Sequence, residues 1–105
     1  MGRRDGAYAV GRRAVMAGRS YCPHWLGSGI GLLAAAQVLA AVGGPGMLEH
    51  DVMENPLREA LGQPFPRVKN GAFPLPAGPG LGVEPDLKGS ADWLMTRAEY
   101  RASKL

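Results

Sequence analysis

The order of the predicted elements places this chain in the α/β class. A helix, a short strand, a second helix and a second short strand follow one another within the first 49 residues. A strand–helix–strand unit of this kind makes its two strands parallel neighbours in one sheet. With 105 residues the chain has room for one small domain. A closed eight-stranded α/β barrel needs about 250 residues.

The first predicted helix and strand precede the apolar part of the chain. Ala7 to Ala17 predicts a short helix, with apolar residues on one side and arginines on the other. Gly18 suits the left-handed residue that follows many helices. Ser20 to Pro23 is predicted to be the first strand, and it ends at Pro23 because proline has no N–H to donate to a sheet.

Residues 25–48 carry no charge and contain the second predicted helix. Ile30 to Val42 predicts an apolar helix about 20 Å long, whereas the hydrocarbon core of a membrane is about 30 Å thick. We therefore expect a buried helix and no membrane partner. After a turn at residues 43–46, Met47 to Glu49 is predicted to be the second strand.

Turns and extended chain dominate the second half of the sequence. Asn55 is a good N-cap for a short helix that begins at the proline after it and ends at Gly62. Residues 62–85 contain six prolines and predict mostly turn and extended chain. Ser90 is predicted to cap a last helix that runs to about Arg101. Candidate short strands lie at Arg67–Lys69 and Ala72–Phe73.

The charge pattern and the cysteine content restrict partners and location. Residues 1–19 carry five arginines and one aspartate of a chain with net charge +3, a pattern typical of a nucleic-acid arm or of a solvated helix face. Only Tyr8 adds an aromatic ring there and no second basic cluster follows, so we expect a solvated face and no nucleic-acid partner. Cys22 is the single cysteine, which excludes an intrachain disulfide. A lone thiol fits a reducing compartment and no export signal is recognisable, so we expect a cytoplasmic protein.

His24 and Glu49 are the candidate catalytic residues. His24 follows the first predicted strand and Glu49 ends the second, and adjacent strands lie about 4.8 Å apart. Ligands of parallel α/β sheets bind beyond the carboxyl ends of the strands, so both side chains would face one cavity. An imidazole beside a carboxylate can act as an acid/base pair near neutral pH. The alternative is a pair of solvated or hydrogen-bonded loop residues.

A glycine-rich segment, residues 27–31, precedes the second helix. Backbone N–H groups at a helix start attract phosphate, but the spacing lacks the third glycine of a dinucleotide fingerprint. We interpret these glycines as small residues that permit close packing of the helix against a strand, and we predict no cofactor-binding residue. No metal ligand is predicted either, because Glu49, His50 and Asp51 are consecutive and neighbours in a strand point to opposite faces.

Four segments in a fixed order resemble the C-terminal barrel region of the enolase superfamily. The similarity is to its mandelate racemase / muconate lactonizing enzyme branch, and in particular to mandelate racemase-like members. It covers roughly residues 20–87. The segments are CPHWLGSGIGLLAAAQVLAAVGG, MLEHD, NPLRE and LPAGPGLGVEPDL.

The resemblance implies a partial (β/α) barrel with flanking helices and a Gly/Pro-rich C-terminal tail. Ser20–Pro23 would be the seventh barrel strand and Met47–Glu49 the eighth. Residues 7–61 would form the βα barrel units, and residues 62–105 the C-terminal return segment with the last helix. Residues 1–105 would then be a single incomplete domain.

The same resemblance implies roles for the candidate pair. His24 would match the general base that moves the proton alpha to a carboxylate, and Glu49 the carboxyl group that hydrogen-bonds the enolate side. The implied reaction is racemisation or acid-sugar dehydration of a carboxylate or sugar-acid substrate, with Mg²⁺ as cofactor. The family takes its metal carboxylates from the third to fifth strands, which have no counterpart in this chain, and Asp5 does not match the sixth-strand motif.

We therefore expect a C-terminal fragment of such an enzyme that is inactive alone. It would take a substrate only when a complementing polypeptide supplies the missing barrel, because without the metal the enolate lacks its main electrostatic stabiliser. The alternative is a small non-catalytic interaction or membrane-associated protein that uses the apolar helix and the basic start.

Overall fold

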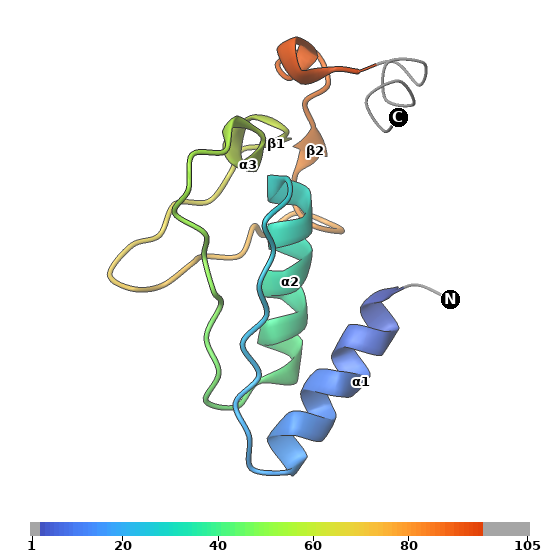
Figure 1. The fold of residues 1–105 in the computed structure, drawn as a ribbon, viewed down its shortest axis with the longest axis vertical. Coiled ribbons are helices and arrows are strands. Elements are labelled where there is room, and N and C mark those ends of the chain that lie inside the picture. The colour runs from blue at the N-terminus through green and yellow to red at the C-terminus, as the bar shows by residue number, and fades with distance from the viewer. Residues whose placement is uncertain (1–2, 96–105) are drawn as a thin grey trace, which may run out of the picture.

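The computed structural model of the chain describes residues 3–95, which form three α-helices, two very short strands and a 3₁₀ turn. Helix α1 (Arg3–Met16) packs against α2 (Gly29–Val42), and two extended segments run along α2 (Figure 1). The remaining helix, both strands and the 3₁₀ turn lie beyond the N-terminal end of α2. This mixture of helix and sheet agrees with the predicted α/β class, although the sheet is much smaller than the sequence predicts.

The two long helices end and meet at glycines. After α1, Gly18 adopts a φ of 71°, and the Arg19 N–H donates to the Ala14 carbonyl at 2.8 Å, which confirms the predicted left-handed cap. Gly11 lies where α1 approaches α2, and a Cβ at this position would stand 2.6 Å from Val42. The close approach of the helices therefore depends on the absence of a side chain at Gly11.

The hydrophobic core of the described residues is small and belongs to α2. The predicted apolar helix is present and begins one residue earlier than expected, at Gly29. Its buried apolar side chains come from its first two turns, its middle and its last residue. They are Leu32, Leu33, Ala36 and Val42.

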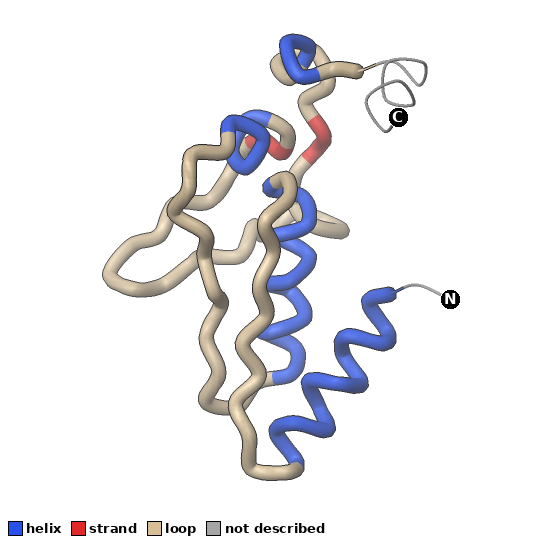
Figure 2. Tube along the Cα trace, viewed as in Figure 1, coloured by secondary structure: helices blue, strands red, loops and turns tan. Residues whose placement is uncertain are grey.

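The two predicted strands are extended segments joined by a single bridge, which corrects the expectation of regular strands at Ser20–Pro23 and Met47–Glu49. The bridge pairs His24 with Glu49 in parallel, and the Glu49 N–H donates to the Pro23 carbonyl at 3.0 Å. The parallel direction is as predicted, and Figure 2 shows both segments as loop alongside α2. A two-stranded pair is marginal alone, and Pro23 cannot donate to a ladder, so the pairing does not extend.

A short antiparallel pair joins regions that the sequence predicts to be turn or extended chain. Strand β1 (Gly62–Gln63) pairs with β2 (Glu84–Pro85), with Gly62 opposite Pro85. Each strand has two residues, which is too short for any alternation of polar and apolar side chains. The pair brings residues more than 20 positions apart together just beyond α2.

Helix α3 (Pro56–Ala60) confirms a local prediction, and a tight hairpin follows it along the chain. The Asn55 side chain caps α3 by accepting from the Leu57 N–H at 3.2 Å. In the hairpin, Lys69 and Ala72 form an isolated antiparallel bridge around Asn70 and Gly71, both at positive φ. An Asn-Gly pair in this conformation is the preferred two-residue hairpin turn. The candidate strands at Arg67–Lys69 and Ala72–Phe73 are thus reduced to this one bridge.

The last predicted helix is a single 3₁₀ turn where the structure describes it. The turn covers Ala91–Trp93, and Leu94 after it is extended. The predicted cap, Ser90, makes no side-chain hydrogen bond to the turn. The first N–H groups of an α-helix have no partner within the helix, so a helix that began here would lack the side-chain acceptor that a cap supplies. The end predicted near Arg101 lies outside the described residues.

Much of the apolar surface of the described residues faces outward. Met16 is 78 % exposed, and Met47 on the second extended segment is 75 % exposed. None of the helices in residues 3–95 has the length and apolar character needed to cross a membrane. Large apolar side chains that are exposed occur on both sides of α2 in the sequence, and none of them belongs to α2 itself. They are Tyr8, Val10, Met16, Trp25, Leu26, Met47, Val52, Met53, Val68, Leu75, Leu87, Trp93, Leu94 and Met95.

Candidate functional site

His24 and Glu49, 25 positions apart in the chain, lie side by side in the structure. The His24 Nδ1 atom is 3.0 Å from the Glu49 carbonyl oxygen and 3.9 Å from its carboxylate. The parallel bridge between the extended segments sets this geometry. The structure therefore brings together both residues that the sequence singles out, while their catalytic role stays a prediction.

The Glu49 carbonyl fixes the form of the neutral His24 ring. A carbonyl oxygen can only accept a hydrogen bond, so Nδ1 must carry the proton and donate it. The lone pair of the neutral imidazole is then on Nε2, which is the form that can accept a proton. A ring held through Nδ1 and basic at Nε2 has the arrangement of a general base.

The ion pair between the two side chains is a weak, solvent-exposed one. The His24 side chain is 40 % exposed and that of Glu49 61 % exposed. A pair of this exposure contributes about 0.2–1 kcal/mol to the stability of the fold when the imidazole is protonated. The carboxylate is nevertheless placed to stabilise an imidazolium that forms when Nε2 takes a proton.

Glycine 46 allows the close approach of the two segments that carry the pair. A Cβ at Gly46 would stand 1.9 Å from the Tyr21 carbonyl oxygen and 2.9 Å from its nitrogen. No side chain fits at that distance from a backbone. This requirement sits three residues before Glu49 and three before His24 on the two segments, and it could not be read from the sequence.

The glycine-rich segment before α2 serves close packing. A Cβ at Gly29 would stand 1.9 Å from the carbonyl oxygen of Arg58, and one at Gly31 would stand 2.1 Å from the Trp25 ring nitrogen. The interpretation as packing residues is confirmed, but the contacts are with α3 and a tryptophan ring. The expected contact with a strand is not the one observed.

A partly buried ion pair holds the loop that follows Glu49. Arg58 Nη2 donates to the Asp51 carboxylate at 3.3 Å, and both side chains are 13 % exposed. The same nitrogen also donates to the Met53 carbonyl, and the Met53 N–H donates to Asp51 at 3.1 Å. Sequence reasoning missed this pair, because a carboxylate and a guanidinium seven positions apart across a turn give no periodic signal.

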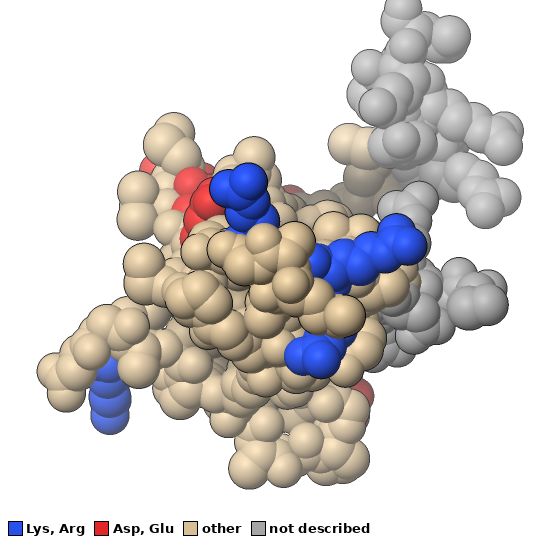
Figure 3. Space-filling model, turned by 90° about the horizontal axis from the view of Figure 1, so that it is seen from below, with Lys and Arg blue, Asp and Glu red and all other residues tan. Residues whose placement is uncertain are grey.

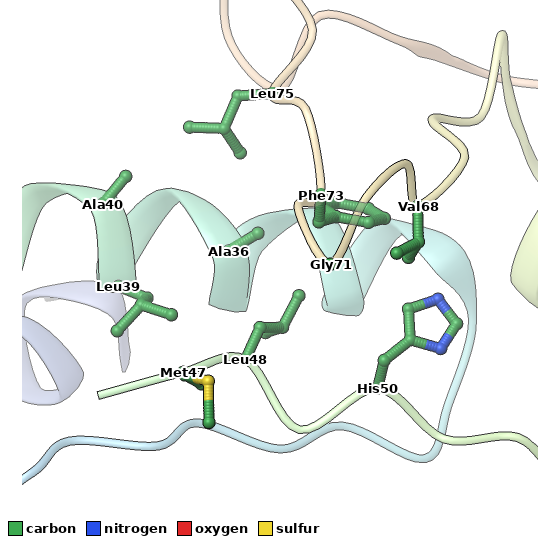
Figure 4. A pocket seen from close by; sticks show the side chains of 10 residues that line it. All are labelled: Ala36, Leu39, Ala40, Met47, Leu48, His50, Val68, Gly71, Phe73 and Leu75. Atoms are coloured by element: carbon green, nitrogen blue, oxygen red, sulfur yellow. The ribbon is translucent and has the colours of Figure 1, made fainter. Parts of the chain in front are cut away.

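A hollow lies on the other side of the extended segment, away from the His24–Glu49 pair. Its volume is about 370 Å³, and its walls come from α2, residues 47–50 and the hairpin (Figure 4). His50 contributes the polar group, and its Nδ1 donates to the Asp51 carbonyl at 2.9 Å. The ring centroids of His50 and Phe73 are 5.9 Å apart. His50 therefore faces an apolar wall and not the candidate site.

The positive charges of the described surface do not form one continuous patch on the face in Figure 3, where Lys and Arg side chains stand apart from one another. Arg12, Arg13 and Arg19 are exposed. Separated cations of this kind are typical of a solvated helix face, whereas a nucleic-acid site usually presents a basic stripe.

A family model described as enolase C-terminal domain-like matches residues 5–89. The match includes α1 from residue 5 onward, α2 and α3, the two extended segments with His24 and Glu49, and the β1–β2 pair. No curated protein and no solved structure matches the chain.

Proposed function

The chain belongs to the enolase C-terminal domain-like family, and on this premise we propose that it contributes the last two strand units of a (β/α) barrel. In that barrel His24 acts as general base toward the proton alpha to a carboxylate. Glu49 hydrogen-bonds the enolate side. The reaction is of the mandelate racemase-like type, a racemisation or an acid-sugar dehydration.

The single observation that supports this proposal is the geometry of the His24 ring. Its Nδ1 is occupied by the Glu49 carbonyl at 3.0 Å, so Nε2 carries the lone pair. When Nε2 takes the alpha proton, the electron pair of the C–H bond stays on the substrate as an enolate. The positive charge of the ring then lies next to the Glu49 carboxylate.

The residues described here do not fit the magnesium that the family uses. Mg²⁺ prefers oxygen ligands in a near-octahedral arrangement, and carboxylates supply most of them. Within residues 3–95 no group of three or more His, Cys, Asp or Glu side chains converges on a point. We therefore assign the metal ligands to the complementing part of the barrel.

The exposed apolar surface supports a complementing polypeptide as the partner. Two extended segments pair with each other through one bridge, and the core of the described residues consists of four side chains from α2. Apolar surface on this scale marks an interaction site or a tendency to aggregate. A barrel that lacks these two strands offers both strand edges and a complementary apolar layer.

The test is reconstitution of proton transfer. The purified chain is mixed with a mandelate racemase-like barrel that has been shortened to its first six strands. Loss of the alpha-proton signal of 2-hydroxy acids and sugar acids in D₂O with Mg²⁺ is followed by ¹H NMR. We expect exchange with the mixture and its loss with His24→Asn, whereas His50→Asn, which changes the ring that faces the apolar hollow, keeps it. Binding without exchange would contradict the catalytic role and favour a non-catalytic interaction protein.

A further inference from the structure

Asn55 connects the two loops that follow the candidate catalytic residues. Its Nδ2 donates to the Leu26 carbonyl at 3.2 Å and to the Gly27 carbonyl at 2.9 Å. Its Oδ1 accepts from the Leu57 N–H at 3.2 Å. One side chain therefore caps α3 and also holds the loop that begins directly after His24.

The contact of Asn55 with residues 26 and 27 matters because the two extended segments are held together at a single point. Beyond the His24–Glu49 bridge, the described segments form no further bridge with each other. A single bridge leaves the direction of the chain after His24 undetermined. The two donors of Asn55 tie that chain to the loop after Glu49 at a point 28 and 29 positions away in the sequence.

The loop that carries Asn55 is itself held in place. The partly buried Asp51–Arg58 ion pair closes the loop on both sides of residue 55, and the Arg58 N–H donates to the Asn55 carbonyl at 3.0 Å. Hydrogen bonds made by a preorganised group lose less conformational entropy than those made by a free loop. Asn55 is thus placed to orient residues 26 and 27, and its own position does not depend on them.

We propose that Asn55 is a positioning residue, which holds the loop after His24 so that His24 Nδ1 stays on the Glu49 carbonyl. The inference rests on the proposed function in one respect: the pair it positions is the proton-transfer pair. Asn55 touches no reacting atom. Its effect is on the tautomer of the His24 ring, which a residue that only caps a helix would not change.

Asn55→Asp separates the two roles of this side chain. An aspartate keeps an oxygen that accepts from the Leu57 N–H, so the cap is retained. It replaces the NH₂ donor with an oxygen that faces two carbonyl oxygens, so the hold on residues 26 and 27 is lost. Asn70→Asp is the matched control, because it makes the same chemical change in the exposed turn of the hairpin.

The readout is the ¹⁵N NMR spectrum of the histidine rings in the full chain. In the wild type and in Asn70→Asp we expect His24 mainly as the Nδ1–H form. In Asn55→Asp we expect the Nδ1–H fraction to fall at least twofold, while His50, whose Nδ1 donates to the Asp51 carbonyl, keeps its form. An unchanged His24 tautomer in a variant whose helix content is unchanged would overturn the proposal.

A second measurement needs no variant. The side-chain amide protons of Asn55 should exchange with D₂O more slowly than those of Asn70 in the wild-type chain. Equal exchange rates would also overturn the proposal. Neither readout depends on turnover, so a failed reconstitution with Mg²⁺ would contradict the proposed function while leaving the positioning role of Asn55 intact.

Discussion

The imidazole of His24 is hydrogen-bonded to the main-chain carbonyl of Glu49, and the carboxylate of Glu49 is the more distant partner. The distances are 3.0 Å from Nδ1 to the carbonyl oxygen and 3.9 Å to the carboxylate. The orientation of the ring therefore depends on the backbone of the second extended segment. The identity of the residue 49 side chain matters for the local charge, and much less for the position of His24.

Glu49→Gln should leave the structure of the pair unchanged. The substitution removes the exposed charge but keeps the carbonyl that accepts from Nδ1. We expect the free energy of unfolding at pH 7 to change by less than about 0.5 kcal/mol and the His24 tautomer to be the same as in the wild type. Urea unfolding followed by circular dichroism and ¹⁵N NMR check this. A shift of the ring to the Nε2–H form would mean that the carboxylate holds it.

Gly46→Ala should separate the two extended segments. The new Cβ would stand 1.9 Å from the Tyr21 carbonyl oxygen, and a backbone atom cannot move aside as a side-chain end can. We expect a destabilisation of about 2–3 kcal/mol and loss of protection of the Glu49 amide in hydrogen exchange.

The control for this change is Gly6→Ala, which lies in α1 with open space around the new Cβ. An alanine in a helix is favoured over glycine by about 0.5–1 kcal/mol, so this variant should be slightly more stable. Equal effects of the two substitutions would show that the segments do not approach as closely as described.

Arg58→Met should be more harmful than its position near the surface suggests. It leaves Asp51, which is 13 % exposed, without its guanidinium partner and frees the Met53 carbonyl. We expect a loss of about 1–3 kcal/mol, between the values for exposed and fully buried pairs. The matched change at an exposed arginine, Arg12→Met, should cost less than about 0.5 kcal/mol. A double-mutant cycle with Asp51→Asn measures the coupling, and a coupling near zero would contradict the ion pair.

Gly31→Ala should displace the Trp25 ring. The Cβ would stand 2.1 Å from the indole nitrogen, which is a side-chain atom and can move. In a Trp93→Phe background, where Trp25 is the single tryptophan, we expect a red shift of the fluorescence emission with a small change in stability. Gly6→Ala in the same background should leave the emission unchanged. No shift in the Gly31 variant would place the ring elsewhere.

The isolated chain should not catalyse proton transfer. The described residues bring together an imidazole and a carboxylate but no group of metal-binding side chains. Without an electrostatic stabiliser for the enolate, the largest contribution to such catalysis is missing. We expect no Mg²⁺-dependent loss of the alpha-proton signal of 2-hydroxy acids in D₂O by ¹H NMR. Turnover by the chain alone, abolished by EDTA, would contradict the need for a complementing barrel.

Local features of the fold could be predicted, and long-range ones largely could not. Gly18 and Asn55 have their effect within a few residues, so their types alone indicate a cap. The predicted strands are too long because ladder formation depends on neighbouring strands, and each segment has one neighbour among the described residues.

The candidate pair was predictable because it follows from topology. A helix between two extended segments makes them parallel, and parallel segments bring their ends together, which places His24 beside Glu49. The hold of Asn55 on residues 26 and 27 was not predictable, since its side chain already had a sufficient local explanation as a cap. The Glu49 carbonyl was missed because sequence reasoning considers side chains and every residue has a carbonyl.

The single bridge between the extended segments also bears on how long a molecule of this chain persists in solution. Each segment has an outer edge whose N–H and C=O groups are available to water or to another extended chain. Local opening of a two-stranded pair requires little free energy, so a protease can reach the region around Glu49 without global unfolding. The lifetime of the free chain would then be set by how soon another strand occupies that edge, and binding would be recorded first as resistance to proteolysis.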